Sequence, residues 1–343
     1  MLQRSGDTIA HSTRADGVGA LRCLAAAFAA ASVLAAPPAP AGGETVKVGL
    51  ITKTDSNPFF VKMRQGAEER ARKLGMELLT AAGKTSDDNV SQVVAIENMV
   101  AAGAKGILIT PSVSKAIVPA IRKARARGVL VIALDSPTDP ESATDALFAT
   151  DNFKAGALVG QYARAATKGR RVKIATIDEG PGSAVGTLRH RGFLEGFGIA
   201  EGDPQIVCKQ PSFGDLAKGQ TAMENCLQKA PGIDVVFTVN EPTAAGVGTA
   251  LTKGGKKPQD VVVVSVDGGC AGVRNVQAGV IDATAQQYPL RMAILGVDAV
   301  AAYAQGGKTA SGYTDTGVNV IAAKAVPGVA SEGVEYGLTN CWE

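Results

Sequence analysis

Five polar residues stand at or shortly after the ends of apolar segments that are typical of β-strands: Asn57, Asp135, Asn240, Asp267 and Gln287. Amides and carboxylates can bind hydroxyl groups in pairs, because each hydroxyl both donates and accepts hydrogen bonds. The carboxyl ends of parallel strands are also where open α/β sheets bind ligands. Any one of these residues could instead cap the following helix. Their repetition along the chain favours one polar site for a polyhydroxylated small molecule.

Two aromatic residues accompany the first of these amides, in the segment Asn57-Pro58-Phe59-Phe60. Aromatic faces pack well against the C–H face of a sugar ring, so Phe59 and Phe60 are candidates for stacking on such a ligand. The alternative is that Pro58 starts a helix and both rings fill the core.

Arg189 is a candidate for the same site, early in a helix predicted for residues 185–197. A guanidinium presents several fixed donors to ring and hydroxyl oxygens. The alternative is a surface arginine paired with Glu195 or another acid.

Apolar segments and amphipathic segments alternate along the rest of the chain. Strands are predicted at 46–51, 76–80, 106–110, 129–134, 172–177, 205–210, 235–240, 261–266 and 281–286. Helical spacing lies between them, and Ser114 is the predicted N-cap of a helix that runs to Arg127. Strict alternation indicates parallel sheets, and its restart after Thr150 indicates two α/β lobes, each a doubly wound parallel sheet. No Pro/Gly/Ser-rich linker lies near Thr150, where the second lobe is predicted to begin. This favours two lobes joined by strands that cross between them.

Residues 1–41 are typical of an export signal peptide. Arg4, Arg14 and Arg22 make the leader positive, residues 24–36 are apolar, and Ala39-Pro40-Ala41 gives a small-x-small cleavage pattern. The apolar stretch is too short to span a bilayer, although a buried or membrane helix is the alternative. We expect an exported protein that begins near Gly42 and is long enough for two lobes.

Composition argues against several function classes. The chain has 35 basic and 32 acidic residues, so it lacks the excess of clustered Lys and Arg of a nucleic-acid footprint. His190 is the only histidine outside the leader, which disfavours Ser-His-Asp catalysis and zinc binding. Residues 180–186 come close to a dinucleotide fingerprint, but the third glycine is one place late. We therefore expect no metal and no cofactor.

Four cysteines follow the leader: Cys208, Cys226, Cys270 and Cys341. An even number in an exported protein indicates two disulfides, for which three pairings exist. Proximity in sequence favours Cys208–Cys226, and hence Cys270–Cys341.

The order and spacing of these segments resemble the periplasmic sugar-binding proteins of the ribose-binding type, which deliver substrate to ABC importers. The resemblance covers residues 45–320. It rests on Ser56-Asn57-Pro58-Phe59-Phe60, Ala133-Leu134-Asp135, Thr150-Asp151-Asn152, Arg189-His190-Arg191-Gly192-Phe193, Val239-Asn240-Glu241, Val266-Asp267-Gly268 and Ala283-Thr284-Ala285-Gln286-Gln287.

This resemblance implies the periplasmic binding protein type 1 fold, with a three-crossing hinge near Thr150, Gln287 and Thr316. The N-terminal lobe would comprise residues 42–150 and 288–316, and the C-terminal lobe residues 151–287 and 317–343. The implied hydroxyl ligands are Asn57, Asp135, Arg189, Asn240, Asp267 and Gln287, with Phe59 and Phe60 stacking on the sugar and Thr150 as a further ligand.

Some residues depart from the ribose-binding pattern. Ser136 stands where ribose binders carry an arginine, and Lys53 and Thr110 replace a hydroxyl residue and an amide. The ending Cys341-Trp342 and the stretch Leu188-Arg189-His190 most resemble the fructose-binding subgroup. Fructose is therefore the first expectation, and ribose-like or mannose-like sugars come next.

The function implied is that of a monomeric, non-enzymatic periplasmic protein that closes on a monosaccharide and passes it to an inner-membrane permease. Three alternatives remain open. One is a sugar sensor for a chemoreceptor or kinase, and another is a Rossmann-type enzyme. The third is a transcription regulator, which would need a helix-turn-helix where the export leader stands.

Overall fold

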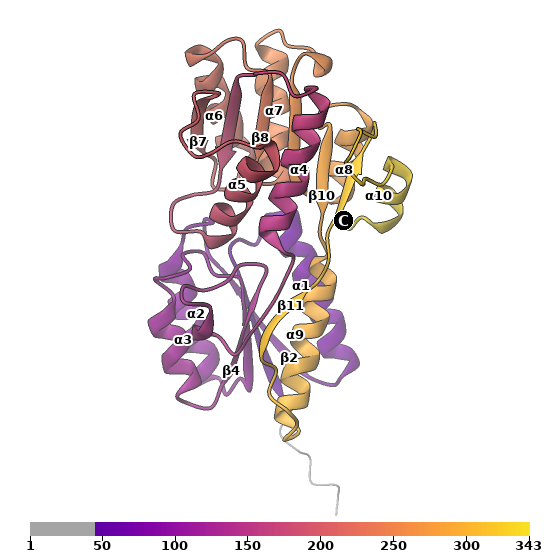
Figure 1. The fold of residues 1–343 in the computed structure, drawn as a ribbon. Coiled ribbons are helices and arrows are strands. Elements are labelled where there is room, and N and C mark those ends of the chain that lie inside the picture. Colours follow the sequence, from indigo (N-terminus) through magenta and orange to yellow (C-terminus); the bar gives the residue numbers. More distant parts are fainter. Residues whose placement is uncertain (1–44) are drawn as a thin grey trace, which may run out of the picture. The chain divides into compact units, whose positions relative to one another are not determined.

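A computed structural model describes residues 45–343 of this chain, and the predicted signal peptide at 1–41 lies outside them. The described residues form two six-stranded sheets (Figure 1). The first has the order β11-β5-β4-β3-β1-β2, and all its neighbouring strands are parallel. Its strands are β1 (Lys47–Thr52), β2 (Glu77–Ala82), β3 (Gly106–Ile109), β4 (Leu130–Leu134), β5 (Ala146–Ala149) and β11 (Gly312–Asp315).

The second sheet has the order β12-β10-β9-β8-β6-β7 and is parallel except at its edge, where β12 runs antiparallel to β10. Its strands are β6 (Ile174–Asp178), β7 (Ile206–Pro211), β8 (Val235–Thr238), β9 (Val262–Asp267), β10 (Ala283–Gln286) and β12 (Asn319–Ala322). The strands predicted from the sequence do not include β5, β11 or β12. These strands are only four residues long, and so short a run carries little periodicity.

Helices cover both faces of each sheet. The first sheet carries α1 (Pro58–Lys73), α2 (Asn89–Ala101), α3 (Val118–Arg125), η1 (Glu141–Ala143) and α9 (Pro289–Ala304). The second carries α4 (Asn152–Ala166), α5 (Ala184–Phe197), α6 (Leu216–Lys229), α7 (Glu241–Lys253), η2 (Pro258–Asp260), α8 (Cys270–Gln277) and α10 (Val334–Asn340). Each sheet with its helices is called a lobe below, the first lobe being that of β1.

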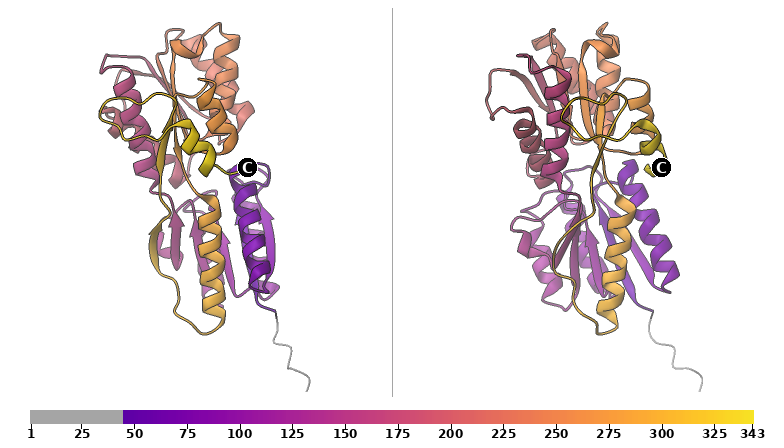
Figure 2. Two further views of the ribbon diagram at one scale, coloured as in Figure 1. Left: turned by 90° about the vertical axis from the view of Figure 1, so that its right-hand side faces the viewer. Right: turned by 45° about the vertical axis from the view of Figure 1, so that its right-hand side comes forward.

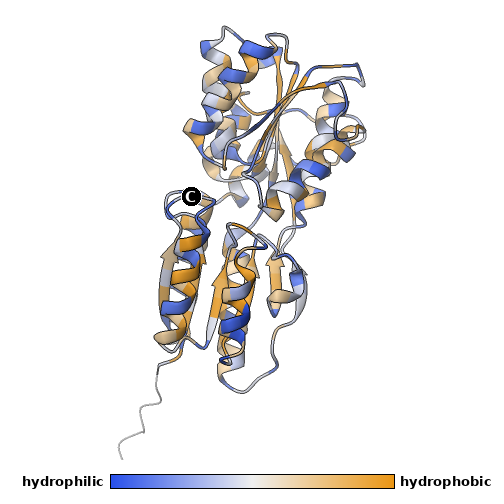
Figure 3. Cartoon of the chain, turned by 90° about the vertical axis from the view of Figure 1, so that its left-hand side faces the viewer, coloured by the Kyte–Doolittle hydropathy of each residue, from blue (hydrophilic) through white to orange (hydrophobic). Residues whose placement is uncertain are grey.

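Alternate strand residues divide the core of each lobe into two layers. In the first lobe, Leu50 and Leu108 pack with α1 and α9 on one face, and these two helices run side by side (Figure 2). Ile51 and Ile107 pack with α2 and α3 on the other face. In Figure 3 the strands are largely apolar, and the helices that cover them carry polar residues on their outer faces. The second lobe repeats the scheme, and the predicted fold class is therefore confirmed.

The chain passes between the lobes three times, at residues 150–151, 287–288 and 316–318. Each connection joins the end of a strand in one lobe to the next element along the chain, which lies in the other lobe (Figure 1). The predicted lobe boundaries fall at these same connections. The division of the chain at these connections into two lobes that move relative to each other stays a prediction.

Two disulfides tie elements of the second lobe together. Cys208 of β7 is bonded to Cys226 of α6, and Cys270 of α8 is bonded to Cys341, which follows α10. This is the pairing predicted from proximity in sequence.

The predicted cap at Ser114 is wrong. Helix α3 begins later, at Val118, and its N-cap Ile117 makes no side-chain hydrogen bond. The Ser114 hydroxyl instead accepts a hydrogen bond from the backbone N–H of Ala184 at 3.1 Å, across the gap between the lobes. A contact with a residue 70 positions away leaves no local pattern in sequence.

Candidate functional site

Eight of the nine predicted site residues line one cavity between the lobes, where the strands of both sheets end. The cavity is lined by Lys53, Asn57, Phe59, Phe60, Ser86, Asp135, Glu179, Val185, Arg189, Asn240, Asp267 and Gln287. A larger chamber of about 670 Å³ adjoins it and shares Asn57, Phe59, Ser86 and Asp267 with it. The cavity therefore opens toward a space large enough to admit a small ligand.

Thr150 is the predicted site residue that does not line this cavity. Its hydroxyl donates to the carbonyl oxygen of Gly317 at 3.1 Å. That bond joins the first crossing to the third, so Thr150 lies within the connections between the lobes.

Asn57, Phe59 and Phe60 lie at the start of α1. The Asn57 Oδ1 accepts from the backbone N–H of Phe59 at 3.0 Å and caps the helix, with Pro58 at its first position. Phe59 and Phe60 are only 3% and 6% exposed, and both belong to the core of the first lobe. The alternative of a helix start with core rings thus describes the local structure correctly. The same residues also form one wall of the cavity.

Helix capping also accounts for Asn240, but not for the two aspartates. The Asn240 side chain accepts from the N–H of Thr243 at 3.1 Å and caps α7. Asp135 and Asp267 cap no helix, and their backbones have φ of 60° and 145°. Such left-handed conformations cost of order 1–3 kcal/mol where the residue is not glycine. Both aspartates therefore line the cavity from positive-φ backbone that helix capping does not explain.

Arg189 lies between these two carboxylates and is 4% exposed. Its Nη2 is 3.5 Å from Asp135 Oδ1 and its Nη1 is 3.8 Å from Asp267 Oδ1. Its Nε donates to Asn152 Oδ1 at 2.8 Å and its Nη1 donates to the Val239 carbonyl oxygen at 2.9 Å. The alternative of an exposed arginine paired with Glu195 is wrong. The guanidinium instead links an acid of the first lobe to an acid of the second.

Two acceptors in the cavity are buried without a hydrogen bond from any residue in the described part of the chain: Asp135 Oδ1 and Gln287 Oε1. The Gln287 Nε2 donates to Asp267 Oδ1 at 2.7 Å, which fixes the amide with Oε1 on its other side. A buried acceptor that lacks a hydrogen bond costs about 1–3 kcal/mol, and for Asp135 Oδ1 the ion pair with Arg189 Nη2 at 3.5 Å offsets part of that cost. A ligand hydroxyl that donates to either oxygen would recover that cost.

Burial changes the acid strength of two carboxyls near the cavity. Burial and the charge of Asp267 raise the pKa of Glu241, and burial also raises the pKa of Asp267, which Arg189 opposes. Glu241 accepts from the backbone N–H groups of Gly268 and Gly269 at 2.8 and 3.0 Å. It thereby holds the turn that follows Asp267.

His190, next to Arg189, fastens α5 to β6. Its Nδ1 lies 2.9 Å from Asp178 Oδ1 and its Nε2 lies 2.7 Å from Glu201 Oε2. Burial opposes the charged imidazolium, but Asp178 and Glu201 together raise the pKa of His190 above its ordinary value. The neighbouring Arg189 consequently projects from an anchored helix.

Four lining residues were not predicted as ligands: Lys53, Ser86, Glu179 and Val185. Lys53 is 2% exposed, and its Nζ donates to Ser183 Oγ of the second lobe at 3.3 Å. Glu179 directly follows β6. It could have been found by the same strand-end rule that found Asp135 and Asp267.

Comparisons with known proteins give the family. A model of the periplasmic binding protein domain matches residues 48–309. The chain belongs to the periplasmic binding protein family. This confirms the resemblance to periplasmic binding proteins, whereas the resemblance to the fructose-binding subgroup stays a prediction.

Named relatives are import or periplasmic binding proteins rather than enzymes. The chain is 33% identical to the ribose import binding protein of Bacillus subtilis, over 71% of this chain and 76% of that protein. It is 30% identical to the D-allose-binding periplasmic protein of Escherichia coli, over 72% and 81%. A periplasmic solute-binding protein of an ABC transporter from Actinobacillus succinogenes, solved with bound D-allose, superposes with a TM-score of 0.71. It is 27% identical and covers 80% of this chain and 97% of its own.

Two further observations concern residues 45–343 alone. No helix there is both long and apolar enough to cross a membrane. No group of three or more His, Cys, Asp or Glu side chains in this range is placed to hold a metal ion.

Proposed function

We propose that this protein captures a monosaccharide in the periplasm, between its two lobes, and delivers it to the permease of an ABC importer. The observation that carries the proposal is the pair of buried acceptors, Asp135 Oδ1 and Gln287 Oε1, which belong to two residues that line one cavity. A sugar hydroxyl can donate to each of them while it accepts from a neighbouring donor. The named relatives support a sugar of the ribose and allose kind.

The two lobes contribute different side chains to the cavity. The first lobe supplies the rings of Phe59 and Phe60 for the carbon skeleton, together with Asn57 and Asp135. The second supplies Arg189, Asn240 and Asp267, and Gln287 comes from the second crossing. The list of ligands is thus the predicted one without Thr150.

Hinge closure follows from that division. A ligand that bonds to Asp135 on one lobe and Asp267 on the other gains contacts to both only when the lobes are close. It therefore shifts the population toward a closed form. The permease would then recognise that closed form, and export through the predicted signal peptide would place the protein in the periplasm.

Two lines of support point to different sugars. The names of the relatives favour ribose and allose, whereas the ending Cys341-Trp342 and the stretch Leu188-Arg189-His190 favour fructose. All three sugars offer several hydroxyls and an apolar face, so all three suit the cavity chemically.

A thermal-shift screen with ribose, allose, fructose, mannose and arabinose tests the proposal. We expect at least one sugar to raise Tm, because a ligand that binds only the folded state stabilises it by mass action. Calorimetry on Asp135→Asn and Asp267→Asn should then show loss of binding to that sugar. Asp282→Asn is the matched control, since Asp282 is mostly buried but lies outside the cavity. No shift with any sugar, or wild-type binding by both cavity variants, would refute the proposal.

A further inference from the structure

The C-terminal tail places a buried tryptophan beside the sugar cavity. Trp342 is the only tryptophan of the chain, and it is 6% exposed. Its ring meets the ring of Phe59 edge-on, with 5.6 Å between the centroids. Although the tail follows α10 of the second lobe, Trp342 packs within the core cluster of the first. The tail therefore makes a contact between the lobes in addition to the three crossings.

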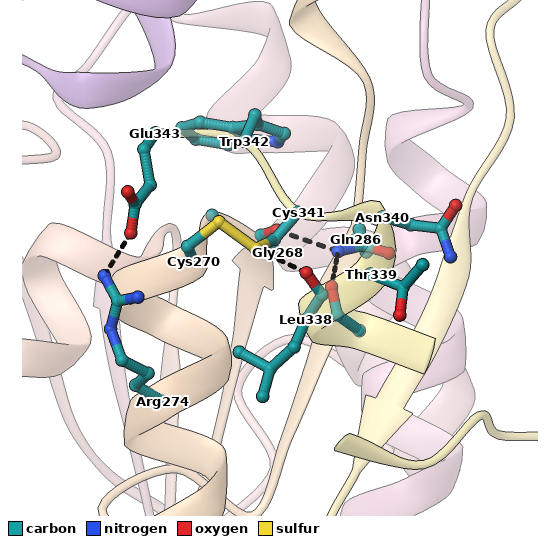
Figure 4. The surroundings of a disulfide bond; sticks show 12 residues. Gly268, Cys270, Arg274, Gln286, Leu338, Thr339, Asn340, Cys341, Trp342 and Glu343 are labelled. Carbon is teal, nitrogen blue, oxygen red and sulfur yellow. Dashed lines mark hydrogen bonds and ion pairs between the residues drawn. A yellow bond between two sulfur atoms is a disulfide. The ribbon is translucent and has the colours of Figure 1, made fainter. Parts of the chain in front are cut away.

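The tail is fastened to the second lobe at each of its last three residues (Figure 4). Cys341 is bonded to Cys270 at the start of α8. The carbonyl oxygen of Trp342 accepts from the N–H of Cys270 at 3.0 Å, and Glu343 forms an ion pair with Arg274 of α8. Trp342 is consequently presented to the first lobe from a covalently held support.

The indole of Trp342 contacts three segments of the chain that carry cavity residues. It packs on Phe59 of the first lobe, and its Nε1 donates to the carbonyl oxygen of Gln287 in the second crossing at 2.9 Å. A Cβ added at Gly269 would lie 3.1 Å from the indole, so the ring also lies against the turn that follows Asp267. The first lobe, a crossing and the second lobe all meet at this one side chain.

We propose that Trp342 is a positioning residue of the sugar site, and that the Cys270–Cys341 disulfide holds Trp342 in place. This inference rests on the proposed function. Without the indole, the Phe59 ring loses one of its two edge-on aromatic partners, with Phe60 remaining, and the Gln287 carbonyl oxygen loses its indole donor. Both residues line the cavity, so sugar affinity depends on the tail, although Trp342 lines only the adjoining chamber and not the cavity itself.

The size of the effect follows from the two contacts that are lost. An edge-on aromatic pair and a buried hydrogen bond each contribute enough to change a binding constant several-fold. For Trp342→Ala we expect the Kd for sugar to rise by about fivefold to a hundredfold. Trp342→Phe keeps a ring against Phe59 but loses the donor to Gln287, so its Kd should lie between those of wild type and Trp342→Ala.

The disulfide is tested with a matched pair of double variants. Cys270→Ser/Cys341→Ser should raise the Kd as Trp342→Ala does. Cys208→Ser/Cys226→Ser removes the other disulfide of the same lobe, which lies away from the cavity, and should leave the Kd unchanged. Because both pairs lose a cross-link, this comparison separates a role in the site from a general loss of stability.

Fluorescence gives a second readout, since all tryptophan emission comes from Trp342. We expect emission to change on titration with the sugar that stabilises the wild type. In Cys270→Ser/Cys341→Ser, emission without sugar should shift to longer wavelength as the indole becomes exposed. Circular dichroism on each variant checks that the two lobes are still folded.

The outcomes separate this inference from the proposed function. If the wild type binds no sugar, the proposed function fails and this inference fails with it. If the wild type binds sugar and Trp342→Ala binds it equally well, only the inference is overturned. A Kd raised as much by Cys208→Ser/Cys226→Ser as by Cys270→Ser/Cys341→Ser would also overturn it.

Discussion

Arg189→Met is the most demanding test of the electrostatics in the cavity. The substitution keeps much of the aliphatic volume and removes the positive charge that separates Asp135 from Asp267. We expect it to abolish sugar binding, because the guanidinium orients both carboxylates. We also expect a large loss of stability that depends on pH in a defined direction.

The magnitude follows from what Arg189 leaves behind. It lies 3.5 and 3.8 Å from the two carboxylates and donates hydrogen bonds of 2.8 and 2.9 Å to Asn152 and Val239. Removing one side of a buried ion pair costs about 3–5 kcal/mol, because the remaining charge stays buried without compensation. We expect the free energy of unfolding at pH 7 to fall by that amount.

The pH dependence follows from Asp267. Burial already raises its pKa in the folded wild type, and Arg189 opposes that rise, so the variant should raise the pKa further. A carboxyl whose folded pKa exceeds its unfolded pKa takes up a proton first in the folded state. Stability therefore increases as pH falls through the folded pKa toward the unfolded value, near 3.9. The stability difference between Arg189→Met and wild type should shrink between pH 7 and pH 5.

Urea unfolding at pH 7, 6 and 5 measures this directly. Arg125→Met serves as control, because Arg125 also pairs with a carboxylate, Asp145, but its side chain is 34% exposed. We expect that control to lose about 1 kcal/mol without recovery at lower pH. A loss for Arg189→Met that is below 1 kcal/mol, or one that is equal at all three pH values, would contradict this account of the cavity.

Two further predictions concern an aromatic wall and a buried acid. Phe60→Ala should raise the Kd for sugar about tenfold through lost ring contact, and an unchanged Kd by calorimetry would exclude a stacking role. Burial raises the pKa of Asp282 to about 6, above its unfolded value. Asp282 therefore adds stability as pH falls from 6 toward 4, and Asp282→Asn should flatten the unfolding free energy over that window. Unfolding curves with equal pH slopes for variant and wild type would exclude this role.

Much of the cavity could be predicted because its residues obey a local rule. Asp135, Asn240 and Asp267 stand at the end of a central strand or within two residues of it, and the carboxyl ends of parallel strands meet at one edge of a sheet. Apolar runs locate those strands, so the position of each polar residue follows from its neighbours in sequence. The same rule, applied to Glu179 after β6, would have added one more lining residue.

The rest of the site depends on contacts between distant segments. Arg189 was recognised as a candidate, but its place between two carboxylates requires both lobes at once. Ser114 looked like a helix cap because local sequence does not show the approach of Ala184 at 3.1 Å. Trp342 contributed to the resemblance to the fructose-binding subgroup, but its place beside Phe59 could not be predicted. The residues near Trp342 in sequence all lie in the second lobe.

The backbone of the two cavity aspartates separates a binding role from a stabilising one. Asparagine and aspartate tolerate left-handed backbone better than most residues, so the φ of 60° at Asp135 alone would be unremarkable. Asp267, at a φ of 145°, lies outside that common region, and both acids are also 3% exposed. Asp267 thus combines an unfavourable backbone with a buried carboxyl, and Asp135 combines a positive φ with a buried carboxyl at the corresponding position of the other lobe. A fold does not need either feature for stability, whereas a site that grips hydroxyls from two sides requires both carboxylates to face the cleft.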